Sequence, residues 1–134
     1  MKLKKKIEGK LTMKKILLFQ VDNPMKVKLA VATMRLRVES IPMEKFNQTV
    51  ESLLNGSKEE EESYQGEKPE GSLLLMCGLS NSEVDQVLYR LRSQKITTTY
   101  KAVLTPTNLG WNVLELYQEM KKEKEEIEAR KEIN

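Results

Sequence analysis

The sequence predicts an α/β domain with a four-stranded, mainly parallel sheet in the order 2-1-3-4 and helices on both faces. Strand-like and helix-like segments alternate as βαβα, then a loop, then βαβα, which favours parallel crossovers in a layered domain. Residues 16–21 and 72–77 are apolar except for Gln20 and Ser72, and they belong at the sheet centre. The alternative is a ferredoxin-like α+β fold in the order 4-1-3-2. It needs a hairpin where residues 42–71 contain a helix.

The first strand and helix have clear boundaries. The strand 16–21 ends at Asp22 and Asn23, either of which can cap a helix, and Pro24 suits the first helical turn. A helix is predicted from residue 24 to about residue 36, with apolar positions spaced for one face. That face contains Val27, Ala30, Val31 and Met34.

The second half of the first unit is an edge strand and a helix. Residues 37–41 alternate polar and apolar as an edge strand does, and Pro42 ends the run. A second amphipathic helix is predicted over residues 43–54, closed by Gly56. Residues 57–71 contain a run of glutamates and are predicted to form a flexible acidic loop.

The second unit repeats this order after residues 72–77. Ser80 and Glu83 have the spacing of a capping box at the start of a helix. Residues 97–104 form the predicted fourth strand, and a turn with capping residues follows. The longest helix then opens at Trp111 and extends to residue 127, beyond which residues 128–134 are predicted to fray.

Composition restricts the possible chemistry. At 134 residues the chain is one domain, and it contains no His, the commonest general base and metal ligand. Cys77 is the sole cysteine, which fits a reducing cytoplasm and excludes an internal disulfide. No secretory signal or membrane-spanning run is evident. These features favour a cytoplasmic, non-catalytic protein, although an enzyme using Asp, Lys, Thr or Cys remains an alternative.

The net charge of +3 comes from the first 13 residues. Removing their five Lys and one Glu leaves 18 basic and 19 acidic residues, a net charge of −1. We therefore predict a disordered basic leader, and we do not expect nucleic-acid binding. A hypothesis is that translation begins at Met13, which mass spectrometry of the native protein would test.

The predicted strand order places a candidate binding crevice at one sheet edge. If the two central strands run in the same direction, the turns that leave them open onto a shared mouth, where α/β sheets bind ligands. Hydroxyl, amide and backbone N–H groups at helix N-termini favour a small anion such as phosphate or carboxylate. The candidate ligand-binding residues are Asp22, Asn23, Gly78, Ser80, Asn81, Thr105, Thr107 and Asn108.

The same residues also have a purely structural explanation, because Ser, Thr, Asn and Asp commonly cap helices. The turn after the first strand lacks the G-x-G-x-x-G pattern of a dinucleotide site. We expect no cofactor and no metal. Cys77 ends an apolar strand and is expected to be a buried core residue, although a helix N-terminus can lower a thiol's pKa.

Two turns carry a resemblance to a known family. One comprises the strand Lys101-Ala102-Val103-Leu104, the turn Thr105-Pro106-Thr107-Asn108 and Trp111. The other is Gly78-Leu79-Ser80. With these features the chain resembles an uncharacterised bacterial family, the domain of unknown function 3783, over roughly residues 13–125. The resemblance implies a small cytoplasmic bacterial protein and assigns no functional residue.

Two functions are therefore expected in order of preference. The first is a binding or regulatory module that holds a small anion at the helix N-termini. The second is a protein-interaction or homodimerisation module that uses the C-terminal helix or an exposed sheet edge.

Overall fold

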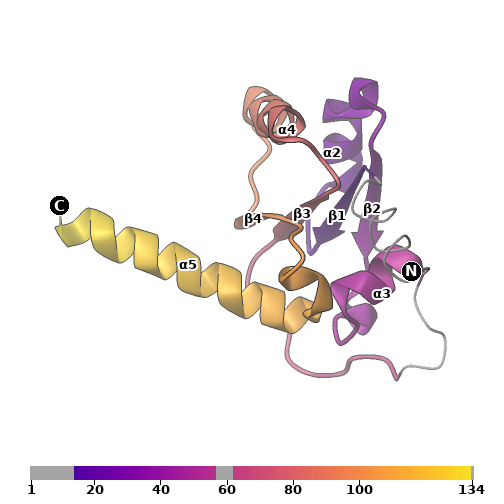
Figure 1. Ribbon diagram of the computed structural model, residues 1–134, viewed down its shortest axis with the longest axis vertical. Coiled ribbons are helices and arrows are strands. Elements are labelled where there is room, and N and C mark those ends of the chain that lie inside the picture. The colour runs from indigo at the N-terminus through magenta and orange to yellow at the C-terminus, as the bar shows by residue number, and fades with distance from the viewer. Residues whose placement is uncertain (1–13, 57–61, 134) are drawn as a thin grey trace.

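The computed structural model describes residues 14–56 and 62–133 of the chain (Figure 1). The predicted leader and residues 57–61 of the predicted acidic loop lie outside the described residues. The sheet has the order β2-β1-β3-β4, with helices on both faces, so the predicted strand order and α/β class are confirmed.

Four strands, four α-helices and three short 3-10 helices make up the described part of the chain. The strands are β1 (Lys15–Phe19), β2 (Arg37–Ile41), β3 (Leu73–Cys77) and β4 (Tyr100–Val103). The α-helices are α2 (Pro24–Ala30), α3 (Val50–Asn55), α4 (Asn81–Ser93) and α5 (Val113–Ile133). The 3-10 helices are η1 (Ala32–Met34), η2 (Met43–Lys45) and η3 (Asn108–Gly110).

The sheet is mixed. β1 is parallel to β2, and β3 is parallel to β4, but the central strands β1 and β3 are antiparallel, with Leu17 opposite Leu75. The expectation that the two apolar strands run in the same direction is therefore wrong. A strand covered on both faces is continuously apolar whichever way its neighbour runs, so the pattern reports burial and not direction.

The antiparallel centre relates the two βαβα units by an approximate half-turn about the contact between Leu17 and Leu75. The first unit is β1-α2-β2-α3 and the second is β3-α4-β4-α5. The relation extends to the helix starts, because the N-cap of α3, Thr49, pairs with Asn112 in an isolated antiparallel bridge. The Val50 N–H donates to the Trp111 carbonyl at 2.9 Å.

Two apolar cores lie on opposite faces of the sheet, because alternate strand residues point to opposite faces. Leu17, Phe19, Leu73 and Leu75 pack with α3 and α5 on one face. Ile16, Leu18, Leu74 and Met76 pack with α2 and α4 on the other. In Figure 1 α2 and α4 accordingly lie on one side of the strands, and α3 and α5 on the other.

Two helices of the first unit are shorter than predicted. α2 ends at Ala30, and η1 follows before Arg35 takes a left-handed conformation with φ of 57°. β-branched residues lose side-chain freedom in helices, and two of them lie at this break. They are Val31 and Thr33. The predicted second helix is likewise divided into η2 and α3.

The start of α5 also differs from the prediction. The helix is capped by Asn112, whose side chain accepts from the Glu115 N–H at 2.8 Å, while the Glu115 carboxylate accepts from the Asn112 N–H at 3.1 Å. Thr107 makes no side-chain capping bond, and Asn108 begins η3 instead. Trp111 therefore precedes the helix and packs against the core from outside it.

Candidate functional site

The predicted shared crevice does not form. Asp22 and Asn23 follow β1, whereas Gly78, Ser80 and Asn81 follow β3. Because β1 and β3 are antiparallel, these two groups lie at opposite ends of the strands. β4 is parallel to β3, so the residues that follow β4 lie at the same end of the sheet as those that follow β3. The predicted site residues after β4 are Thr105, Thr107 and Asn108.

At the end of β3, two of the predicted residues, Gly78 and Ser80, do line one hollow of about 420 Å³. Its other lining residues are Lys14, Leu79, Glu83, Val103 and Leu104. Gly78 has φ of 73°, a left-handed conformation that glycine adopts without strain. The turn therefore owes its glycine to backbone geometry.

The N-terminus of α4 already holds an anion, the carboxylate of Glu83. The Ser80 N–H donates to Glu83 Oε1 at 2.9 Å, and the Glu83 N–H donates to Ser80 Oγ at 3.1 Å, which confirms the capping box. Lys14 Nζ lies 2.7 Å from Glu83 Oε2. The hydrogen bond from Lys14, followed by that from the Ser80 backbone, lowers the pKa of Glu83. An added anion would have to compete with this carboxylate.

The other predicted residues also bond locally. Asn23 Oδ1 accepts from the Lys26 N–H at 3.2 Å and caps α2. The backbone N–H groups of Thr105 and Asn108 each donate to the other's side chain, and Asn108 Nδ2 donates to the Val103 carbonyl at 3.0 Å. These bonds explain the residue types in the turns. Anion binding by any of them stays a prediction.

Cys77 lies in the core and is not poised as a nucleophile. Burial raises the pKa of its thiol to about 12, although nearby Lys15 acts in the opposite direction. A thiol with so high a pKa is protonated at neutral pH and a poor nucleophile. Across residues 14–56 and 62–133, no three Cys, Asp or Glu side chains are grouped to hold a metal ion.

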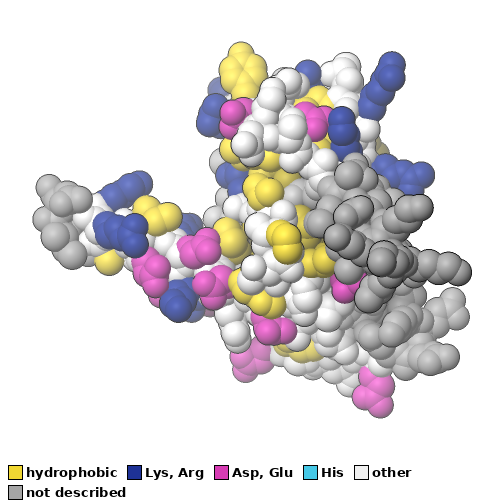
Figure 2. Space-filling model, in the orientation of Figure 1, with side chains coloured by type: hydrophobic (Ala, Val, Ile, Leu, Met, Phe, Trp, Pro, Cys, Tyr) yellow, Lys and Arg dark blue, Asp and Glu magenta, His cyan; other side chains and the backbone are white. Residues whose placement is uncertain are grey.

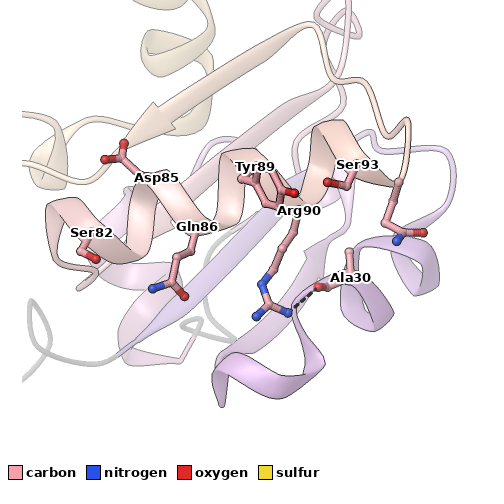
Figure 3. Close-up of a pocket in the computed structure, with 8 residues that line it drawn as sticks. Ala30, Ser82, Asp85, Gln86, Tyr89, Arg90 and Ser93 are labelled. Carbon is pink, nitrogen blue, oxygen red and sulfur yellow. Dashed lines mark hydrogen bonds between the residues drawn. The ribbon is translucent and has the colours of Figure 1, made fainter.

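A hollow of about 610 Å³ lies on the outer surface of α4, beside α2. Figure 3 shows its side chains, among them Asp85, Tyr89 and Arg90, projecting from α4. Arg90 Nη1 donates to the Ala30 carbonyl at 3.4 Å and to Thr33 Oγ1 at 2.8 Å, so this guanidinium links α4 to α2. None of the residues predicted to bind a ligand lines this hollow.

An aromatic group that the sequence analysis missed lies between α5 and the core. The Tyr117 ring centroid lies 6.0 Å from that of Tyr100 and 6.1 Å from that of Phe46. The Tyr117 hydroxyl lies 3.0 Å from the Gly71 carbonyl oxygen and accepts from Gln20 Nε2 at 3.1 Å. Burial raises the pKa of Tyr117 to about 12. These contacts fasten the segment before β3 to α5.

A groove lies between α5 and the edge strand β4, and one face of α5 lines it. The groove has a volume of about 420 Å³, and Lys124 Nζ lies 5.6 Å from the centroid of the Tyr100 ring. Helical residues lining this groove are Met120, Glu123, Lys124, Ile127, Glu128 and Lys131. All side chains from Lys121 to Lys131 are exposed, and Ile127 is 50% exposed.

α5 extends well beyond the body of the molecule (Figure 1). Figure 2 shows Lys and Arg side chains interspersed with Asp and Glu along this projecting arm, with hydrophobic side chains among them. Its first turns pack on the sheet through Val113, Leu116 and Tyr117. Apart from the approach of Lys124 to the Tyr100 ring, the described part of the far half of the helix is therefore exposed surface.

Comparison with known proteins adds a family for the second unit. No curated protein and no solved structure matches the chain. No helix in the described part of the chain combines the length and apolar character needed to cross a membrane. A family model described as Domain of unknown function (DUF3783) matches residues 72–127, which run from the start of β3 into α5. The match therefore covers the second βαβα unit of this chain, including most of the projecting helix, and none of the first unit.

Proposed function

We propose that this chain is a non-catalytic, cytoplasmic protein-interaction module in which the projecting half of α5 provides the contact surface. The observation that carries the proposal is the continuity of one helix face. Val113 and Tyr117 on this face are buried against the sheet, and the same face continues outward through Met120 and Ile127. The helix thus continues an apolar face to Ile127, which is 50% exposed.

The length of α5 supports the same function. Short isolated helices are marginal in water, and most helix stability in proteins comes from packing. The part from Lys121 to Lys131 has only exposed side chains. A protein partner along the helix face would supply the packing that this part lacks.

The adjacent sheet edge enlarges the proposed surface. β4 is the last strand of the sheet, and Val103 on it is 41% exposed. Edge strands with free backbone groups are ready sites for pairing with another chain. Anion binding is left out of this proposal, because Glu83 occupies the N-terminus of α4.

Site-specific photo-crosslinking tests the proposal. A photoreactive amino acid replaces Ile127 on the inner face, or Lys122 on the outer face as a matched control, in the cells that make the protein. We expect adducts from position 127 in clear excess over position 122. Their mass distinguishes a second copy from a different protein. Equal or absent adducts at the two positions would contradict an interaction face on α5.

A further inference from the structure

The inner face of α5 has the spacing of a coiled-coil seam. Its residues are separated alternately by four and three positions, as the a and d positions of heptads are. The seam is Val113, Tyr117, Met120, Lys124, Ile127 and Lys131. The first two are buried in the body and the others line the groove beside β4.

The charged residues that flank this seam have opposite signs along each side. One side carries Lys121 and, one heptad later, Glu128; the other carries Glu123 and, one heptad later, Arg130. Flanking charges of this kind select the partner and the orientation of coiled coils. Along α5, the first side is positive and then negative, and the second side is negative and then positive. When a second copy of the helix runs in the opposite direction, each charge therefore meets a charge of opposite sign.

Antiparallel pairing of two copies satisfies every flanking charge. With Ile127 of one helix opposite Lys124 of the second, Lys121 faces Glu128 and Glu123 faces Arg130. Twofold symmetry repeats both pairs, which gives four opposite-charge contacts. Across the seam, the aliphatic part of the Lys124 side chain meets an apolar residue, as long amphipathic side chains commonly do.

Parallel pairing of the same helices is disfavoured. It places Lys124 against Lys124 in the seam and brings Glu123 near Glu128 across it. Like charges placed opposite one another are repulsive, so the sequence discriminates against this arrangement.

We propose that the partner of α5 is a second copy of this chain, bound through antiparallel pairing of the projecting helices. The proposal rests on the proposed function and names its partner. Met120 is partly buried against the core, so Ile127 is the apolar residue that the described seam carries beyond the body. The dimer is therefore weak and depends on protein concentration, because small, polar interfaces bind weakly.

Charge exchange on the full-length chain tests this pairing by sedimentation equilibrium. The double variant Lys121→Glu with Arg130→Glu makes all four contacts repulsive, and so does Glu123→Lys with Glu128→Lys. We expect each variant alone to dissociate at least about tenfold more readily than the wild type, given four exposed pairs of modest strength. An equimolar mixture of the two variants restores all four attractions and recovers dimers.

A matched control makes two Glu→Lys exchanges on the outer face of α5, and so changes the net charge as Glu123→Lys with Glu128→Lys does. Glu125→Lys with Glu126→Lys leaves the seam and its flanks intact, so its self-association should equal that of the wild type. Circular dichroism of every variant checks that α5 remains helical. A monomeric wild type, equal weakening of the control, or a mixture that stays monomeric would each overturn the self-pairing. Crosslinks from position 127 to a different protein would then still support the interaction module.

Discussion

The two βαβα units share one skeleton and differ most in their last helix. In both units the final helix follows a 3-10 turn, begins at a capped residue and packs on the same face of the sheet. α3 is 6 residues long, whereas α5 is 21. The first unit shows that a helix of about two turns suffices to cover its part of the sheet. The additional length of α5 is therefore available for another purpose.

The crossover helices α2 and α4 also differ in length, and again the helix of the second unit is the longer one. α4 has 13 residues and a complete capping box, with Arg90 and Arg92 in its last turn, where the helix dipole favours cations. α2 has 7 residues, a single capping side chain from Asn23 and no acidic residue in its first turn. Local signals for helix formation are thus stronger in the second unit, which is also the unit that matches the family model.

The largest expected effect comes from the contact at the centre of the half-turn. Leu17 and Leu75 are fully buried and face each other across β1 and β3. Leu17→Ala and Leu75→Ala should each lower the free energy of unfolding by about 2–5 kcal/mol, measured by urea denaturation. If the units are equivalent in the core, the two losses agree within about 1 kcal/mol. A much smaller loss at one position would show that the units do not share the core equally.

Tyr117 offers a second comparison, because the corresponding position of α3 is Leu54, five residues after the N-cap in each helix. Tyr117→Phe removes the hydroxyl that bonds to Gln20 Nε2 and to the carbonyls of Phe19 and Gly71, while Gln20 Nε2 keeps its own bond to Gly71 at 2.9 Å. We expect a loss of about 1–3 kcal/mol at pH 7, because several hydrogen bonds are lost at a largely buried site. Leu54→Met, which keeps the volume, is the control and should cost less than about 1.5 kcal/mol.

The pH dependence of stability should identify Tyr117 independently. Burial raises its pKa from 10 to about 12, so its contribution is complete below about pH 10 and is lost as the pH rises toward 12. Absorbance titration of tyrosinate should therefore show one late step that Tyr117→Phe removes. If that variant retains the late step, another tyrosine titrates there and the assignment is incorrect.

A smaller difference is expected between the helix caps. Ser80→Ala removes one half of a reciprocal capping box and should cost about 1 kcal/mol, measured by thermal unfolding. Asn23→Ala removes a single, longer bond and should cost less, about 0.5 kcal/mol. Ser82→Ala in the first turn of α4 serves as the control and should be nearly neutral. Equal losses at Ser80 and Asn23 would contradict the stronger local specification of the second unit.

The smallest effect should follow from shortening α5. Truncation after Lys121 removes a part of the helix whose described side chains, from Lys122 to Lys131, are all exposed, so the free energy of unfolding should change by less than about 0.5 kcal/mol. The same truncation should abolish the proposed dimer. A large loss of stability in the monomer would mean that the projecting half supports the fold.

Much of the fold could be predicted from the sequence. The continuous apolar runs identified β1 and β3 as central strands, and the spacing of Ser80 and Glu83 identified the capping box. Strand direction could not be predicted, because Leu17 and Leu75 are equally buried in either orientation. The predicted crevice failed for that reason.

Only some features of α5 could be predicted from the sequence. Sequence periodicity located the helix but not its cap. The side chains of Thr105 and Asn108 accept from each other's backbone N–H groups and therefore do not cap α5. The aromatic group around Tyr117 joins segments far apart in the chain, so spacing could not reveal it. The charges that flank the seam can be read from the sequence, but they indicate a pairing surface only because α5 extends beyond the body of the molecule.

The antiparallel centre of the sheet has one further consequence. A polypeptide limited to residues 72–127 would leave the wholly apolar strand β3 without its neighbour, at an unprotected margin of a two-stranded sheet. Two such half-domains could complete each other by meeting as β1 and β3 do here. In this chain the first unit is tethered to the second and fills that place intramolecularly, at a high effective concentration.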